Sequence, residues 1–134
     1  MSNLFDKTTD ALATSLQMRQ VRHNVTSANI ANAETPGYHA KKVEFEDALA
    51  RALDLDGMSK LTTSHGEHFP VGGKAEVTPG IYDNPEAAVS NDGNTVDLEK
   101  EMSALTENSI LYKTALQLIN KKMASLRYAI SESR

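Results

Sequence analysis

The sequence predicts a mainly α-helical protein in which long N- and C-terminal helices pack as an antiparallel coiled-coil hairpin. Three observations support this fold class. Apolar residues recur in a 4-3-4-3 spacing over residues 96–131, and a patchier stripe of the same kind runs through residues 3–33. Between these segments, residues 57–95 hold all but one of the seven glycines and three of the four prolines. Two long helices are therefore expected to flank an irregular middle.

The first long helix is expected over residues 3–33. Nine positions fall on alternating three- and four-residue steps, and six of them are apolar: Leu4, Lys7, Ala11, Thr14, Met18, Val21, Val25, Ala28 and Asn32. A helix of about 30 residues spans roughly 45 Å. It should end before Pro36, because proline disfavours helical geometry in the residue before it, and Gly37 permits a turn.

Asn29 and Asn32 stand three residues apart at the end of this helix and allow two interpretations. They are either ordinary polar residues at a helix end, or they form hydrogen bonds across a helix interface and fix its register. Tyr38, after the turn, is either a packing residue or an anchor against a neighbouring subunit.

A short middle helix is expected over residues 44–55, with one apolar face and a stop at Asp56-Gly57. Its apolar face consists of Phe45, Ala48, Leu49, Ala52 and Leu53. The following residues 57–95 are expected to form an irregular loop with a possible small β hairpin, since their apolar runs, such as Ile81-Tyr82, are brief.

The second long helix is expected over residues 96–131 and carries the clearest pattern. Nine of its ten heptad positions are apolar: Leu98, Met102, Leu105, Ser109, Tyr112, Leu116, Ile119, Met123, Leu126 and Ile130. Asn94 or Thr95 can cap its start. Leu111, Ala115 and Leu118 widen the apolar face, so this helix is expected to contact more than one neighbour.

Composition excludes several classes of protein. The net charge is −4, and the acidity is concentrated in residues 34–95, which carry eleven acidic and five basic groups. No basic stripe indicates nucleic-acid binding, and no apolar run reaches transmembrane length. The chain has no cysteine, so a disulfide framework and a thiolate metal site are excluded. Without a signal-peptide pattern at residues 1–7, the residues alone point to the cytoplasm.

Catalytic and metal-binding patterns are weak. His65-Gly66-Glu67-His68 resembles a metal-ligand cluster, but it lacks the helical His-Glu-x-x-His spacing and an evident fourth ligand, so a solvated loop is favoured. Asp92-Gly93-Asn94 lacks the rest of an EF-hand and is interpreted as a turn into the last helix. No nucleophile motif or phosphate loop is present, so we expect neither an enzyme nor a cofactor.

Two stretches resemble a known family. Asn29-Ile30-Ala31-Asn32-Ala33-Glu34-Thr35-Pro36-Gly37-Tyr38 resembles the N-terminal signature of the bacterial flagellar rod and hook proteins, the axial family. His39–Leu49 and Asn94–Met102 are similar to the short proximal rod subunits of that family, although His39 replaces a more usual Lys, Gln or Arg. The resemblance runs from Leu4 to about Ser131 and implies a single axial domain over residues 1–134, divided into 1–35 (N-terminal helix), 36–95 (turn, short helix and loop) and 96–134 (C-terminal helix).

The resemblance also implies a function. Subunits of this family are exported unfolded through the flagellar type III apparatus without a cleaved signal, and their terminal helices form a hollow, torque-transmitting rod in the periplasmic space. The partners implied are further copies of the chain, other rod proteins such as FlgC, the basal adaptor FliE and the export apparatus, with no nucleic acid and no membrane insertion.

A two-helix hairpin buries one seam, so apolar stripes left outside it favour association. The residues expected at the assembly interface are Leu4, Ala11, Met18, Val21, Val25, Asn29, Asn32, Pro36, Gly37, Tyr38, Leu98, Met102, Leu105, Tyr112, Leu116, Ile119, Met123 and Leu126. Three alternatives stay open: another axial protein such as FlgC, a cytoplasmic coiled-coil adaptor or export chaperone, and an enzyme that uses His65 and His68.

Overall fold

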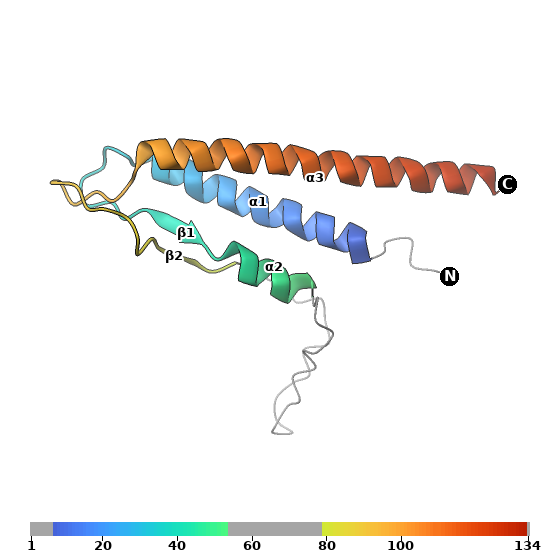
Figure 1. Ribbon diagram of the computed structural model, residues 1–134, viewed down its shortest axis with the longest axis horizontal. Coiled ribbons are helices and arrows are strands. Elements are labelled where there is room, and N and C mark those ends of the chain that lie inside the picture. The colour runs from blue at the N-terminus through green and yellow to red at the C-terminus, as the bar shows by residue number, and fades with distance from the viewer. Residues whose placement is uncertain (1–6, 54–78, 134) are drawn as a thin grey trace, which may run out of the picture.

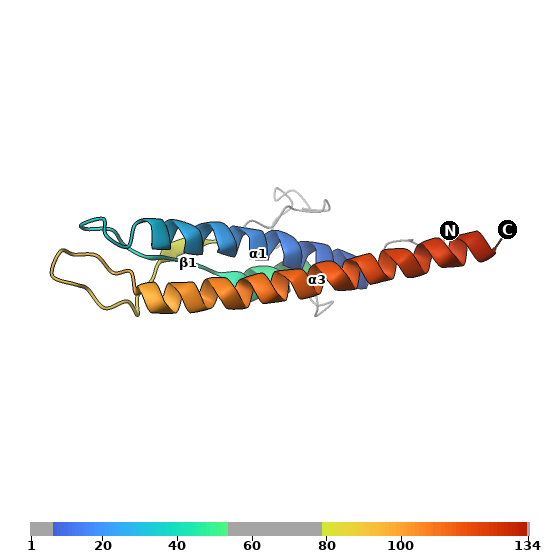
Figure 2. The same cartoon turned by 90° about the horizontal axis from the view of Figure 1, so that it is seen from above.

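The computed structural model describes residues 7–53 and 79–133. In these residues the element order is α1 (Lys7–Ala31), β1 (Lys41–Val43), α2 (Phe45–Leu53), β2 (Ile81–Asp83) and α3 (Leu98–Glu132). The two long helices run antiparallel and lie side by side, as both views show (Figures 1 and 2). The predicted mainly helical hairpin with a short middle helix is therefore confirmed.

Helix α1 is the middle layer of the molecule. It contacts α3 on one side and α2 and β1 on the other, and within the described residues α2 and α3 do not contact each other (Figure 1). Since one helix has to serve two neighbours, its partly buried positions occur around much of its circumference. This explains why its apolar stripe is patchy in the sequence.

A small apolar core lies between α1 and α2. Met18, Phe45 and Ala48 are buried there, and Leu49 packs against them. The guanidinium groups of Arg19 and Arg22 lie over the ring of Phe45, at 4.9 and 4.3 Å from its centroid. Cations at these distances are attracted to the negative face of the ring, so both arginines help to cover the core.

The two strands pair across a long stretch of sequence. Lys42 lies opposite Tyr82 in an antiparallel ladder, and two backbone hydrogen bonds flank the strands, from Glu44 N to Gly80 O and from Asn84 N to Ala40 O. The possible hairpin was expected within residues 57–95. The structure instead pairs β2, from that region, with β1, which precedes α2.

The start of α3 corrects one prediction. Asp97, rather than Asn94 or Thr95, is the N-cap residue, because its carboxylate accepts a hydrogen bond from Lys100 N at 3.2 Å. The side chains of Asn94 and Thr95 are unavailable for this role because they bind backbone groups of the segment between α1 and β1.

The seam between α1 and α3 keeps six of the ten predicted positions, Ser109 and Met123 among them, and the other four are exposed. Leu105, Tyr112, Ile119 and Leu126 are half-buried as expected, but the buried residues between them are Asn108 and Ala115. Leu98, Met102, Leu116 and Ile130, also predicted for the seam, are exposed. Ala115 is small and lets the helices approach closely, which a leucine at that position would prevent.

The two helices differ in length, so part of α3 extends past α1. Asn108 of α3 lies opposite Arg19 of α1. Since both helices rise about 1.5 Å per residue, Lys7 lies opposite roughly residue 120, and about the last twelve residues of α3 extend beyond it (Figure 1). Expectations for Leu4, for the start of the first helix and for His65–His68 fall outside the described residues.

Candidate assembly site

The first part of the candidate site is a hydrogen-bonded connection between the two long helices, formed by residues 29–41 and 90–97 and called the junction below. Asn29, at the last turn of α1, is 1% exposed. Its Nδ2 donates to Lys41 O at 2.8 Å, while its Oδ1 accepts from Lys41 N at 2.9 Å and from the Tyr38 hydroxyl at 3.2 Å. Both the nitrogen and the oxygen of the Asn29 side-chain amide are thus hydrogen-bonded to Lys41 of β1.

The side-chain amide of Asn29 makes the two hydrogen bonds to β1 that a neighbouring strand would otherwise make. In an antiparallel ladder, the backbone groups of alternate residues point away from the partner strand. Because Ala40 and Glu44 bond toward β2, the N–H and C=O of Lys41 point toward α1, where the amide of Asn29 meets both. Asn29 therefore closes one edge of the sheet and fixes the direction in which the chain leaves α1.

Asn32 closes the end of α1. Its Nδ2 donates to Ala28 O at 2.8 Å, and its Oδ1 accepts from the Thr35 hydroxyl at 3.2 Å. Both bonds are local and satisfy groups at a helix end, as expected of a polar residue there. Of the two interpretations, Asn32 fits the helix-end role, whereas Asn29 bonds to β1 and Tyr38 and not across to α3.

The turn after α1 lies against the loop before α3. Gly37 has φ +73° and its N–H donates to Asp92 O at 2.9 Å. Gly93 has φ +80°, and a Cβ on it would stand 3.5 Å from Gly37 Cα. Both glycines occupy the left-handed region that other residues adopt at a cost. The predicted turn at Asp92-Gly93-Asn94 is confirmed.

Asn94 and Thr95 fasten the two loops together. Asn94 Nδ2 donates to Asn32 O at 2.9 Å and to Thr35 O at 2.7 Å, and its Oδ1 accepts from Val96 N at 2.7 Å. The Thr95 hydroxyl accepts from Ala40 N at 2.8 Å. Sequence reasoning missed these roles because it assigned both residues to helix capping, although the stretch that contains them carries the family resemblance.

A polar contact also sets the register of α1 against α3, and the sequence analysis did not identify it. Asn108 is 3% exposed, and its Nδ2 donates to Arg19 O at 2.8 Å. Arg19 Nη1 donates back to Asn108 Oδ1 at 3.5 Å. Burial, together with the neighbouring Arg22 guanidinium, lowers the pKa of Arg19. Asn108 lies one residue before the predicted heptad position Ser109, so the heptad pattern gave no signal for this contact.

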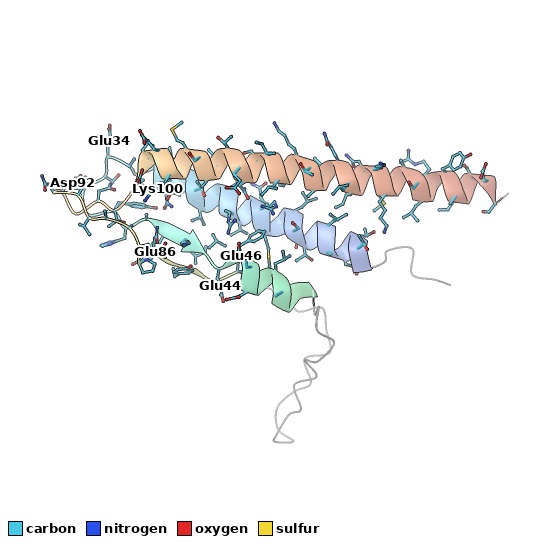
Figure 3. The ribbon with its side chains drawn as sticks, in the orientation of Figure 1. Glu34, Glu44, Glu46, Glu86, Asp92 and Lys100 are labelled. Carbon is cyan, nitrogen blue, oxygen red and sulfur yellow. The ribbon has the colours of Figure 1, made fainter. Side chains whose placement is uncertain are left out.

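The second part of the candidate site is an exposed apolar surface on α3, called the open stripe. Of the eleven large apolar side chains that are exposed in the described residues, eight lie on α3: Leu98, Met102, Ile110, Leu111, Leu116, Leu118, Tyr128 and Ile130. Side chains project along the edge of α3 that faces away from α1 (Figure 3). Since successive helix residues turn by about 100°, these eight side chains are spread around the exposed circumference of α3. Exposed apolar area on this scale is typical of an interaction site.

The predicted interface residues divide by exposure. Met18 and Asn29 are buried inside the chain, so in this conformation they are not available to a neighbour. Exposed members are Pro36, Gly37, Leu98, Met102 and Leu116. Half-buried members are Ala11, Val21, Val25, Asn32, Tyr38, Leu105, Tyr112, Ile119, Met123 and Leu126. Leu4 lies outside the described residues.

The described residues hold no group of three or more His, Asp or Glu side chains arranged to bind a metal. None of the helices within residues 7–53 and 79–133 is long and apolar enough to cross a membrane. What the described part of the chain offers is a rigid junction beside an uncovered apolar helix face, an arrangement suited to packing against protein.

Comparison with known proteins identifies relatives over most of the chain. A family model described as "Flagella basal body rod protein" matches residues 10–39, which run from α1 through the turn of the junction. The chain is similar to the flagellar basal body rod protein FlgB of Aeromonas hydrophila, with 39% identity over 132 residues, 97% of each chain. It is 39% identical to FlgB of Cereibacter sphaeroides (strain ATCC 17029 / ATH 2.4.9) over 118 residues, 88% of this chain and 89% of the relative. It is also 33% identical to FlgB of Escherichia coli (strain K12) over 119 residues, 83% of each.

Proposed function

The chain belongs to the family of flagellar basal body rod proteins named FlgB, and from this premise we propose that it assembles with further copies of itself, through its terminal helices, into a hollow shaft that transmits torque. As a member of this family it is a structural component of the rod in the flagellar basal body. The assembly contacts and the mechanical role are the proposal.

The open stripe of α3 is the single observation that supports self-assembly most strongly. Leu116 and Met102 lie on it, 39% and 55% exposed. Removing apolar surface from water is worth roughly 25 cal/mol per Å², so covering eight large side chains contributes several kcal/mol. Within the chain's described residues, α1 covers only the other side of α3, so a neighbouring subunit is the natural cover.

Helices that pack side by side along a common axis account for a shaft. Contacts between two different surfaces, repeated from copy to copy without closing, generate a helical assembly. A seam shared by many long helices resists twisting because every helix is held along its length. The family resemblance adds the expected neighbours: other rod subunits such as FlgC, the adaptor FliE and the export apparatus.

The family also bears on localisation and export. Basal body localisation follows from family membership, whereas a periplasmic position and export without a cleaved signal belong to the proposal. Few residues are fully buried in the described chain, and no cysteine is present to form a disulfide. A small core with low stability is compatible with passage through an export channel in an unfolded state.

Complementation of a deletion strain tests the proposal. The unaltered chain should restore rods and copurify with detergent-extracted basal bodies. Leu116→Asp places a charge on the open stripe, and its burial against a neighbour is costly, so incorporation should be lost while the isolated chain keeps its helix content. Thr106→Lys, an exposed α3 position off the predicted heptad seam but one turn from Met102 and Ile110, should reduce incorporation less.

Three outcomes would contradict the proposal. Normal rods with Leu116→Asp would remove the open stripe from the assembly. Normal rods in the deletion strain, together with a stable cytoplasmic dimer, would favour the adaptor or chaperone alternative. Loss of function on replacing His65 and His68 with alanine would favour an enzyme.

A further inference from the structure

A charged groove lies where α1, β1 and α3 meet, and it shares Leu111 with the open stripe. Its cavity has a volume of about 220 Å³, room for one or two side chains. Five basic side chains line it against two acidic ones, Glu101 and Glu107. The basic residues are Arg19, Arg22, Lys41, Lys42 and Lys100. Apolar side chains, among them Val25 and Leu111, complete the lining.

The positive charge of this groove is only partly compensated. Lys41 pairs with Asp83, Lys42 with Glu86 at 3.8 Å, and Lys100, at the exposed start of α3, with Asp97 at 3.7 Å. Arg22 reaches Glu46 at 3.6 Å. Arg19, by contrast, meets Asn108 and the ring of Phe45 but forms no ion pair within the described part of the chain. A guanidinium with unused donors binds a carboxylate well, so the groove suits a carboxylate-bearing partner.

The opposite chemistry lies at the end of the same molecule. The tip, defined as residues 33–37 and 88–93, carries Glu34 and Asp92 and no basic residue. Both side chains lie at the end of the molecule beyond the start of α3 (Figure 3). Glu34 is exposed and forms no hydrogen bond or ion pair with other described residues. Val89, 69% exposed, adds an apolar contact.

The junction holds the tip rigid. Asn94 binds Thr35 O, and Gly37 N–H binds Asp92 O, so the two loops of the tip move as one body. A preorganised tip loses little conformational entropy on docking. A rigid acidic projection with an apolar residue therefore complements a basic groove with apolar walls in charge and in size.

We propose that the tip of one copy docks in the groove of the next copy, with the Glu34 carboxylate between Lys100 and Arg19. This inference rests on the proposed self-assembly and names one of its contacts. Each copy carries one tip and one groove, so the contact joins unlike surfaces and can repeat without closing. It defines the stagger between neighbours, whereas the open stripe supplies apolar area.

A charge exchange tests the contact in the complemented deletion strain. Glu34→Lys and Lys100→Glu should each reduce incorporation into basal bodies about fivefold, the order expected for one interfacial ion pair. The double variant should restore it. Lys113→Glu makes the same charge change on α3. Lys113 lines a neighbouring cavity that shares Arg19 and Asn108 with the groove, but it does not line the groove itself, so this variant should stay within about twofold of the unaltered chain.

Cysteine crosslinking provides an independent measurement, because the chain has no cysteine of its own. Two differently tagged copies are coexpressed, one with Glu34→Cys and the other with Lys100→Cys. A disulfide-linked pair carrying both tags is expected in purified basal bodies, and its yield should exceed at least fivefold that of Glu34→Cys with Lys113→Cys.

The outcomes separate this inference from the proposed function. If Lys100→Glu impairs incorporation and Glu34→Lys does not restore it, another acidic surface occupies the groove and the inference is wrong. Equal crosslinking at Lys100 and Lys113, in variants that still enter basal bodies, would overturn the tip contact and leave the rod function standing. Failure of the unaltered chain to enter basal bodies would overturn both.

Discussion

At the residue scale, buried amide side chains hold the segments of the chain together, a role that longer strands or a larger core have in other proteins. Asn29, Asn94 and Asn108 are almost fully buried, and each bonds to backbone groups distant in sequence. No described buried side-chain nitrogen or oxygen lacks a hydrogen-bond partner. Buried polar groups are costly unless every bond is made, so these residues specify one arrangement of the chain.

Replacing Asn29 tests this role. Asn29→Ala leaves the Lys41 N–H and C=O and the Tyr38 hydroxyl without their partner at a 1% exposed position. The free energy of unfolding should fall by about 2–3 kcal/mol, measured by thermal or urea denaturation of the isolated chain. Asn24→Ala, an exposed asparagine on the same helix, should change it by less than about 0.5 kcal/mol. Equal effects of the two variants would contradict the role of Asn29.

Acid should loosen the tip through Asp92. The Ser90 hydroxyl and then Asn94 N–H donate to its carboxylate and lower the pKa of Asp92. A carboxyl whose pKa is lower in the folded chain stabilises it above the unfolded value, near 3.9, and loses this contribution as pH falls through the folded value. The unfolding temperature should therefore drop below about pH 4.

Asp92→Asn is the matched variant, since its amide oxygen still accepts both bonds but does not titrate. Its unfolding temperature should fall less steeply with acid than that of the unaltered chain. Some acid dependence should remain, because a hydrogen bond from Lys41 also lowers the pKa of Asp83. Identical pH profiles for the two proteins would contradict the contribution of Asp92.

At the element scale, α3 carries two neighbouring stripes, one packed against α1 and one exposed. One stripe, with Asn108 and Ala115, faces α1 within the chain. The other, with Met102 and Leu116, is more apolar and stays exposed. Within the chain, α3 packs closely against α1 through Ala115, and the hydrogen bond of Asn108 fixes the register. The larger apolar area of α3 therefore remains available for association.

The register of this seam can be tested with adjacent residues. Ala115→Leu adds volume at a 7% exposed position and should destabilise the isolated chain by about 1–3 kcal/mol. Leu116→Ala, one residue away and 39% exposed, should change the stability of the isolated chain little but reduce incorporation into the rod. Denaturation measures the first effect and basal body fractionation the second. The opposite pattern would place Leu116, and not Ala115, in the seam within the chain.

At the scale of the whole molecule, buried and hydrogen-bonded residues gather at one end of the described chain, called the bonded end, and the other end, where α3 extends past α1, has none that are buried. The junction, the strands and the core at Met18 occupy the same part of the structure, beside the first half of α3 (Figure 1). From Leu116 to its end at Glu132, α3 has no buried residue. The bonded end is therefore expected to be formed in the isolated chain, whereas the far end of α3 depends on neighbours.

Hydrogen exchange tests this division. In the isolated chain, amides of residues 121–132 should exchange about 100-fold faster than those around Asn108–Ala115, which corresponds to about 2.7 kcal/mol of opening free energy. In purified basal bodies the difference should largely disappear, because packed neighbours protect the whole helix. Uniform protection of α3 in the isolated chain would mean that the far end needs no cover.

The sequence by itself determined where the helices lie, because the helix period and the Pro36-Gly37 turn act over a few residues. It also determined that more apolar surface exists than one hairpin can bury. Only the tertiary structure decided which stripe of α3 faces α1, since two stripes one residue apart are both compatible with the helical period. The stripe with Ala115 faces α1 because its small side chain lets the two helices approach closely. The pairing of β1 with β2, and the bonds of Asn29 and Asn94, likewise join residues from 12 to 62 positions apart, which no local pattern specifies.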